Sequence, residues 1–141
     1  MKGTLMGITV YRNNFDLGQK LYRLTIDCTK ARTEQAASIG KLLADELINV
    51  RPKMRSMQLE RCLMNVLGTL PPDSMIKDID VMFNPSYAVD VLKVLINAYK
   101  QKTFSLVWPG TYQDGYLIYA EEGYRDYKTY NIGEYDIVCM I

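Results

Sequence analysis

Apolar and polar positions alternate along several short stretches of this chain, and each such stretch predicts a β-strand. In residues 21–28 the side chains of Tyr22, Leu24, Ile26 and Cys28 share one face, as the two-residue period of a strand requires. Short apolar runs predict further strands over residues 47–50, 75–83, 103–108, 116–120 and 136–141. Residues 5–11 fit either another strand or the lead-in to a short helix over residues 15–21.

A period near 3.6 residues predicts three longer helices, over residues 33–46, 56–67 and 86–100. Thr33 is the expected N-cap of the first of these helices. Strands that alternate with helices are typical of a mostly parallel sheet covered on its faces. The sequence therefore predicts one α/β domain over residues 1–141, with three layers and a mostly parallel sheet between flanking helices.

Composition removes several function classes. The chain has 141 residues and a net charge of +1, so no global field draws it onto nucleic acid or membrane. It has no histidine, which excludes Ser-His and Cys-His catalysis. The three cysteines lie far apart, as is typical of a reducing cytosol. The start of the chain lacks the pattern of a signal peptide and no apolar run is long enough to span a bilayer, so we expect a cytoplasmic protein without a membrane partner.

The junction between the first long strand and the first helix is where a phosphate-binding loop would lie. Such a loop reads G-x-x-x-x-G-K-S/T, because glycines let backbone N–H groups approach the phosphates and the lysine neutralises them. In this register Cys28 and Thr33 replace the glycines, Glu34 replaces the lysine and Gln35 replaces the hydroxyl residue. The stretch is either a plain turn or a degenerate anion site that uses backbone N–H groups, a helix dipole, Lys30 and Arg32. Its candidate binding residues are Cys28, Thr29, Lys30, Ala31, Arg32 and Thr33.

Two acidic residues, Asp78 and Asp80, fall on one side of the strand predicted over residues 75–83. Paired carboxylates can hold Mg²⁺ or move protons. The other reading is a solvated strand end with Lys77 as an ion partner.

Two further segments are candidates for binding macromolecules. A basic cluster could contact phosphate groups of nucleic acid, or it could be a solvated face; it consists of Arg51, Lys53, Arg55 and Arg61. Seven of the 11 tyrosines lie between Tyr112 and Tyr135 among mostly acidic neighbours. That charge repels nucleic acid, so we interpret the tyrosine-rich segment as a protein–protein contact surface.

The order of features in residues 75–141 resembles the C-terminal half of BrxF, the small P-loop protein of type 3 BREX anti-phage systems. The features are a strand ending in residues 79–83 and followed by Asn84-Pro85, the exit Trp108-Pro109-Gly110, the segment 115–121, and the segment 124–130.

This resemblance implies a compact P-loop fold similar to AAA-type ATPases, with its phosphate loop at residues 28–35. The chain departs from the family pattern in that loop. It departs again where the Mg²⁺-organising carboxylate is expected, since Lys77 occupies that position and Asp78 restores it only after a shift of one residue.

We therefore expect a nonenzymatic pseudo-ATPase component of a BREX-like system, without a cofactor, that binds other proteins of the system and can form a homo-oligomer. Two alternatives stay open. One is an unconventional ATPase in which Lys30 and Arg32 neutralise phosphate and Asp78 or Asp80 holds Mg²⁺. The other is a nucleic-acid-binding module that uses the basic cluster.

Overall fold

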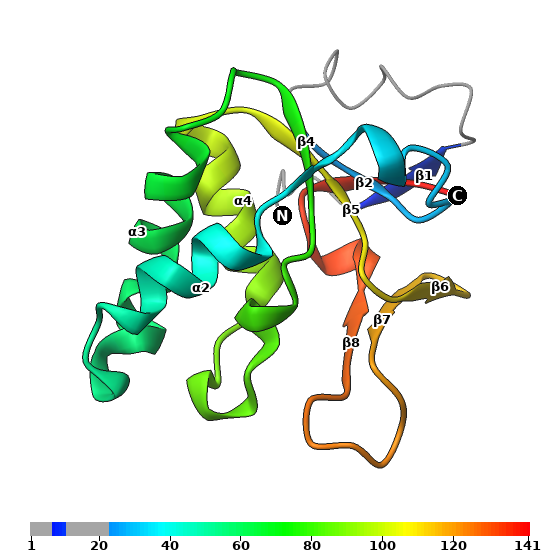
Figure 1. Ribbon diagram of the computed structural model, residues 1–141. Helices are drawn as coiled ribbons and strands as arrows, with labels where there is room; N and C mark the ends of the chain where they lie inside the picture. Colours follow the sequence, from blue (N-terminus) through cyan, green and yellow to red (C-terminus); the bar gives the residue numbers. More distant parts are fainter. Residues whose placement is uncertain (1–6, 11–22) are drawn as a thin grey trace.

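A six-stranded parallel sheet organises this protein, whose computed structural model describes residues 7–10 and 23–141 (Figure 1). Its strands are β1 (Ile8–Val10), β2 (Leu24–Asp27), β3 (Ala37–Ser38), β4 (Ser74–Lys77), β5 (Phe104–Val107) and β9 (Ile137–Met140). They lie in the order β1-β9-β2-β5-β4-β3, and neighbouring strands are parallel throughout. The carboxyl ends of β2, β5, β4 and β3 consequently meet at one edge of the sheet.

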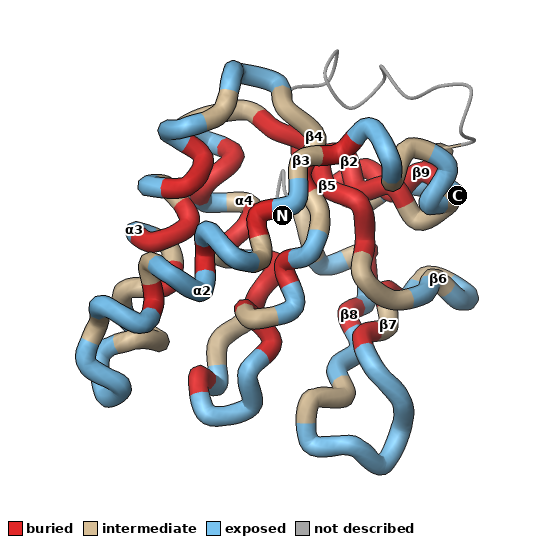
Figure 2. Tube along the Cα trace, viewed as in Figure 1, coloured by how far each residue is buried: buried red, intermediate tan, exposed pale blue. Residues whose placement is uncertain are grey.

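Helices α2 (Gly40–Ile48), α3 (Arg55–Leu67) and α4 (Val91–Gln101) lie together beside the sheet in Figure 1. Their apolar stripes share one core with residues of β2, β4, β5 and β9. Every residue of β2, β5 and β9 is buried (Figure 2), as parallel strands usually are. The predicted α/β class and mostly parallel sheet are confirmed. Among the described residues, no helix has both the length and the apolar character needed to cross a bilayer.

A second, antiparallel sheet comes between β5 and β9 in the chain. It consists of β6 (Thr111–Gln113), β7 (Tyr116–Tyr119) and β8 (Lys128–Asn131). Asp114 and Gly115 form the two-residue turn between β6 and β7, and both have positive φ, 50° and 85°. An Asp-Gly pair is the favoured sequence for such a hairpin turn. The sequence predicted only β7 of these three strands.

The helix predicted over residues 33–46 is wrong in its first half. Thr33–Gln35 forms a single 3₁₀ turn, β3 follows, and α2 begins only at Gly40. Thr33 is not an N-cap, because its hydroxyl donates to the carbonyl oxygen of Lys30 (2.8 Å). The extended stretch pairs with β4, so this part of the chain takes its backbone hydrogen bonds from the sheet instead of from a helix.

The strand predicted over residues 47–50 is also wrong, because Leu47 and Ile48 form the last turn of α2. Leu47 is buried, whereas Ile48 is 72% exposed. A run of four apolar residues does not distinguish the end of a helix from a short strand, and the helix is the structure that lets Leu47 join the core.

The strand predicted over residues 75–83 is correct only as far as Lys77, where β4 ends. A 3₁₀ helix over Asp80–Phe83 follows and buries Met82 and Phe83. Asp78 lies between the two elements with a left-handed φ of 63°. That conformation turns the chain out of the sheet, so the apolar residues beyond it reach the core from a turn.

The helix predicted over residues 86–100 begins later than expected, at Val91. Asp90 is its N-cap, and the Asp90 carboxylate accepts a hydrogen bond from the amide of Lys93 (3.2 Å). Pro85–Tyr87 forms a separate 3₁₀ turn, and Ala88 has a φ of 51°. This left-handed residue interrupts the helical path ahead of the cap.

The remaining predicted elements are confirmed with small changes at their ends. They are the strands over residues 21–28, 103–108, 116–120 and 136–141 and the helix over residues 56–67; residues 21–22 of the first strand lie outside the described residues. For residues 5–11 the structure has the strand Ile8–Val10. The short helix predicted over residues 15–21 lies outside the described residues.

Candidate functional site

The loop that leaves β2 is organised by the carboxylate of Asp27. This side chain has no exposed surface, and its Oδ1 accepts hydrogen bonds from the amide (2.8 Å) and the hydroxyl (2.6 Å) of Thr29. The Thr29 hydroxyl oxygen in turn accepts a bond from the amide of Ala31 (3.1 Å). The second carboxylate oxygen of Asp27, Oδ2, is buried without a hydrogen-bond partner. Asp27 therefore shapes the start of the loop through local side chain–backbone bonds.

Most backbone N–H groups of this loop donate to acceptors inside the protein. The amides of Thr29 and Ala31 donate to side-chain oxygens of the loop, as described above. Four further amides donate to backbone carbonyl oxygens at 2.8–3.3 Å: Cys28 to Met140, Thr33 to Lys30, Gln35 to Arg32 and Ala36 to Thr33. A loop that holds phosphate must aim such N–H groups at the ligand. Six residues of this loop instead use their N–H groups within the fold.

The residues predicted for the degenerate phosphate loop are not arranged around one point. Cys28 and Thr29 are half-buried, whereas Lys30 and Ala31 are exposed. Lys30 has a left-handed φ of 62°, and Arg32 is the N-cap residue of the three-residue 3₁₀ turn. Since α2 begins only at Gly40, the long helix expected to direct its dipole at an anion does not start at this loop.

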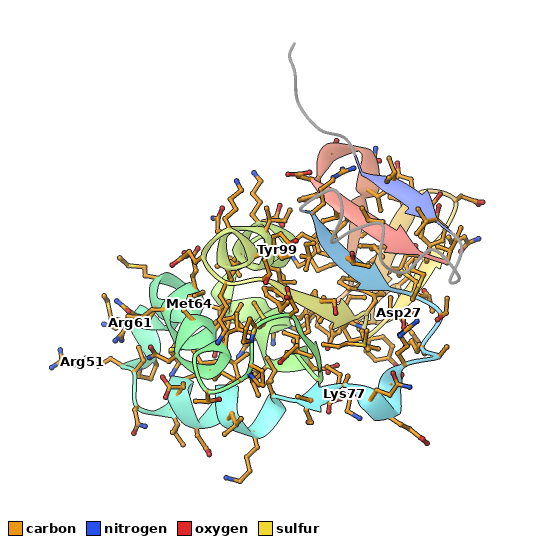
Figure 3. All side chains as sticks on the ribbon, turned by 90° about the horizontal axis from the view of Figure 1, so that it is seen from above. Asp27, Arg51, Arg61, Met64, Lys77 and Tyr99 are labelled. Atoms are coloured by element: carbon orange, nitrogen blue, oxygen red, sulfur yellow. The ribbon has the colours of Figure 1, made fainter. Side chains whose placement is uncertain are left out.

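Lys77 connects the end of β4 to the same loop. Its ammonium group donates a hydrogen bond to the carbonyl oxygen of Thr33 (2.9 Å). Figure 3 shows Lys77 and Asp27 on the side of the molecule away from Arg51 and Arg61. Lys77 stands where a Mg²⁺-organising carboxylate was expected, and its hydrogen bond holds the loop after β2 next to the end of β4.

The expectation that Asp78 and Asp80 share one side of a strand is wrong, because β4 ends before either residue. Asp78 accepts a hydrogen bond from the hydroxyl of Ser38 on β3, at 2.5 Å. Asp80 accepts one from the hydroxyl of Tyr119 on β7, at 3.0 Å. The two carboxylates thus connect different elements, and their role in holding Mg²⁺ stays a prediction. Within the described ranges, no three His, Cys, Asp or Glu side chains group closely enough to hold a metal ion.

A cavity of about 200 Å³ opens at this edge of the sheet. Its lining consists of Lys30, Thr33, Lys77, Asp78, Asp80, Val107, Trp108 and Pro109. The crevice outside the carboxyl ends of parallel strands is where ligands bind in open α/β sheets, so this is the best-placed candidate site. It brings Lys30 near Asp78 and Asp80, as the ATPase alternative requires, but its lining has as many lysines as aspartates.

Trp108, which lines the cavity, is held in a cluster of aromatic side chains. Trp108 is fully buried, and its indole N–H donates to the carbonyl oxygens of Thr111 (3.1 Å) and Ile118 (3.0 Å). The rings of Phe83 and Tyr119 stack with centroids 3.8 Å apart. Burial, followed by the hydrogen bond to Asp80 and its charge, raises the pKa of the Tyr119 hydroxyl above its ordinary value. The Tyr119 hydroxyl therefore stays protonated at physiological pH and can keep its hydrogen bond to Asp80.

Cys28 and Cys139 lie next to each other on the face of the sheet that meets the helices. Cys139 is fully buried. Its contact with Cys28, together with burial, raises the pKa of the Cys139 thiol. A raised pKa keeps that thiol protonated, which is the opposite of what a nucleophilic cysteine needs.

The basic cluster lies at the far end of the molecule from the cavity, at the connection between α2 and α3 (Figure 3). Arg51, Lys53 and Arg61 are exposed. Arg55 instead donates through Nε to the carbonyl oxygen of Val50 (3.0 Å). The structure therefore brings three of the four predicted basic residues to the surface of one end and uses the fourth to hold a turn.

The candidate binding residues predicted from the sequence begin at Cys28 and leave out Asp27, the last residue of β2. The available signal was an acidic residue that closes an otherwise apolar run, Leu24–Asp27, immediately before a threonine-containing turn.

Comparisons with protein-family models, with curated proteins and with solved structures found no match for this chain.

Proposed function

We propose that this chain is a nonenzymatic, ATPase-like domain that works through protein–protein contacts as a component of a BREX-like phage-defence system. The resemblance of residues 75–141 to BrxF suggests the system and a three-layer P-loop fold similar to AAA-type ATPases. The parallel sheet with β2 in its interior supports the fold. The geometry of the loop after β2 supports the absence of ATP hydrolysis.

One observation carries this proposal: six residues of the loop give their N–H groups to acceptors within the chain. Binding a triphosphate there would require breaking the Asp27–Thr29 bonds or the 3₁₀ turn. The cavity of about 200 Å³ is also smaller than the roughly 300–1,000 Å³ of pockets that hold drug-sized ligands. Both features support a domain that has the parallel sheet of a nucleotide-binding fold. At the edge of the sheet where a nucleotide would bind, this domain forms hydrogen bonds within the protein instead.

The tyrosine-rich segment is the proposed contact surface for other proteins. Tyr116 and Tyr124 are 44% and 66% exposed, whereas Tyr119 and Tyr130 are buried. Exposed tyrosines combine apolar area with a polar tip and are enriched in protein interfaces. Glu121 and Glu122 are exposed next to them, which favours a partner with a basic surface.

Thermal unfolding with ATP or ADP, each with and without Mg²⁺, tests the pseudo-ATPase part. A ligand that binds only the native state stabilises it by about 2.7 kcal/mol at a hundredfold excess over its dissociation constant. We expect no change in melting temperature at millimolar nucleotide. A saturable, Mg²⁺-dependent rise would refute the proposal.

A second candidate function, an ATPase with an unconventional site, is favoured by one observation: the cavity brings Lys30 together with Asp78 and Asp80. In that case Lys30 would neutralise phosphate and an aspartate would hold Mg²⁺. The thermal rise would then disappear in Lys30→Ala and in Asp78→Asn and would persist in Lys41→Ala, whose side chain is exposed on α2.

The assignment to a defence system has a separate test in the neighbouring genes. A methyltransferase gene together with a large phosphatase-like or ATPase gene would support it. An unrelated operon would remove the assignment and leave the proposal of a pseudo-ATPase domain standing.

A further inference from the structure

Three apolar or aromatic side chains stand out among the described residues because more than 60% of each is exposed. They are Met57 (73%), Ile48 (72%) and Tyr124 (66%). Ile48 ends α2 and Met57 lies in the first turns of α3, whereas Tyr124 lies in the loop between β7 and β8. Large exposed apolar side chains that gather with charged neighbours mark interaction surfaces.

The first of these surfaces, here called the α2–α3 end, consists of Ile48, Arg51, Lys53, Met57 and Arg61. Met57 and Arg61 are one helical turn apart, on the side of α3 opposite the buried Leu59 and Leu63. Residues 48–61 include four basic residues and one acidic residue. That acidic residue, Glu60, accepts a hydrogen bond from Gln101. The α2–α3 end therefore combines two exposed apolar side chains with an excess of positive charge.

The second surface, here called the loop hollow, is a cavity of about 500 Å³ beside the β7–β8 loop. It is lined by Asn84, Pro85, Ser86, Tyr124, Arg125 and Asp126. Residues 120–127 include three acidic residues and one basic residue, and Glu121 and Glu122 are exposed.

The walls of the loop hollow have a defined shape. Backbone hydrogen bonds from Tyr124 to Glu121 and from Tyr127 to Tyr124, both 3.1 Å, hold the loop in successive turns. The Asn84 side chain accepts a bond from the amide of Ser86 (3.0 Å) and fixes the opposite wall. A preorganised hollow costs little entropy when a partner enters it.

We propose that the α2–α3 end of one copy of this chain docks into the loop hollow of a second copy. The two surfaces carry exposed apolar or aromatic side chains and opposite net charge: Ile48 and Met57 would contact Tyr124, and Arg51 and Arg61 would face Glu121 and Glu122, which precede the hollow's own Arg125 and Asp126 in the β7–β8 loop. A thioether against a tyrosine ring is also a favourable contact. The inference rests on the proposed function, a domain that works through protein contacts, and names a second copy as one partner.

The two surfaces lie apart on the molecule: in Figure 1 the connection between α2 and α3 is at the left, and the loop between β7 and β8 is at the lower right. One copy therefore keeps a free α2–α3 end and a free loop hollow after a single contact forms. Such a head-to-tail contact adds copies until a ring closes or a filament grows. A symmetric dimer would stop at two copies, so the masses of the species formed distinguish it from head-to-tail association.

Sedimentation velocity and light scattering of the full chain over about 1 to 100 µM, a range that detects micromolar affinity, provide the measurement. We expect species heavier than the 16.2 kDa monomer that dissociate as salt screens the charges. Met57→Glu disables the α2–α3 end, and Tyr124→Ala together with Glu122→Lys disables the loop hollow. Either change alone should weaken self-association about tenfold or more, the equivalent of 1.4 kcal/mol.

The decisive experiment mixes the two disabled proteins. Each retains one intact surface that matches the intact surface of the other, so the mixture should form a one-to-one dimer and nothing larger. Leu42→Glu is the matched control, because Leu42 is 46% exposed on α2 and belongs to neither surface; it should associate like the unchanged chain. All these positions are on the surface, and circular dichroism verifies that each variant folds.

Three results would overturn the inference: a chain that is monomeric throughout the range, variants that associate normally, or a mixture that grows beyond a dimer. A monomeric chain whose α2–α3 end binds duplex DNA until Met57→Glu is introduced would assign that end to nucleic acid instead. The readout is mass and not nucleotide binding, so failure here leaves the thermal test of the pseudo-ATPase proposal unaffected.

Discussion

The Lys77 ammonium group lies 2.9 Å from the carbonyl oxygen of Thr33 and donates a hydrogen bond to it. This bond joins residues 44 positions apart in the chain and fixes the loop after β2 against the carboxyl end of β4. In a nucleotide-binding domain these two places are expected to hold phosphate and Mg²⁺. Here the protein contacts itself at both.

Replacing Lys77 by methionine keeps most of the aliphatic stem and removes the charged donor. We expect the free energy of unfolding in urea to fall by about 1 to 2 kcal/mol, because a hydrogen bond from a charged group to a half-buried carbonyl is lost. Lys41→Met is the control, since the Lys41 side chain is 87% exposed and pairs with Asp45 on the same helix; its effect should stay within about 0.5 kcal/mol. Equal effects in the two variants would show that the Lys77–Thr33 bond does not stabilise the loop.

Two substitutions at Asp27 separate its role as an acceptor from its size. Asp27→Ala leaves the amide and hydroxyl of Thr29 without their acceptor, and we expect it to lower the free energy of unfolding by about 2 to 3 kcal/mol. Asp27→Asn retains a carbonyl oxygen that can accept the same bonds, so its loss should be clearly smaller. Urea unfolding monitored by Trp108 fluorescence measures both. If the asparagine variant is as unstable as the alanine variant, the turn does not depend on the acceptor atom.

Alkaline pH should destabilise the protein through the buried Tyr119 and the half-buried Tyr135. Burial, then hydrogen bonds to Asp90 and Asp80, raises the pKa of the Tyr135 and Tyr119 hydroxyls above the ordinary value, which is about 10. The folded state therefore holds these protons more tightly than the unfolded chain does. The resulting stability is fully present below pH of about 10 and is lost as the pH rises beyond it.

Tyr135→Phe tests this pH dependence. The variant lacks this titrating hydroxyl, so its free energy of unfolding should fall less steeply above pH 10 than that of the unchanged chain. The two slopes should differ by up to about 1.4 kcal/mol per pH unit. At neutral pH the same variant should lose about 1 kcal/mol with the hydrogen bond to Asp90. Tyr116→Phe, at an exposed position, should leave the alkaline slope unchanged. An unchanged slope in Tyr135→Phe would contradict the assignment.

Duplex DNA should bind this chain weakly and without sequence preference. The net charge is +1, and of the predicted basic cluster Arg55 is turned to the carbonyl oxygen of Val50. We expect no binding by fluorescence anisotropy at physiological salt, and at low salt only a weak signal that is abolished in Arg51→Glu/Arg61→Glu. Tight, salt-sensitive binding by the unchanged chain that disappears in this double variant would instead make nucleic acid the partner.

The buried strands were predictable because apolar runs such as Phe104–Val107 and Ile137–Met140 are bounded by turn residues and polar residues. The hairpin at Asp114 and Gly115 was also predictable, since the Asp-Gly pair is a strong turn signal, but the short strand β6 before it has no apolar alternation. A short strand such as β6 forms because it pairs with a neighbouring strand, here β7. The local sequence pattern carries no information about that pairing.

The candidate site was predictable in location but not in structure. The cavity lies where strands were expected to end, and its lining includes Lys30, Thr33, Asp78 and Asp80. Helical periodicity from Ala36 onward hid the edge strand β3, whose extended form depends on pairing with β4. The contact of Lys77 with Thr33 depends on that same pairing, so no spacing in the sequence predicts it.

The most direct test of the central claim, that the loop after β2 is closed to nucleotide, follows the amides of Thr29 and Ala31. In a chain labelled with ¹⁵N, their NMR signals are recorded while ATP and Mg²⁺ are added to millimolar concentration. Because both amides donate to acceptors within the loop, we predict that their chemical shifts stay constant. Saturable shifts of these two signals on addition of nucleotide would contradict the account and make the loop a nucleotide-binding site.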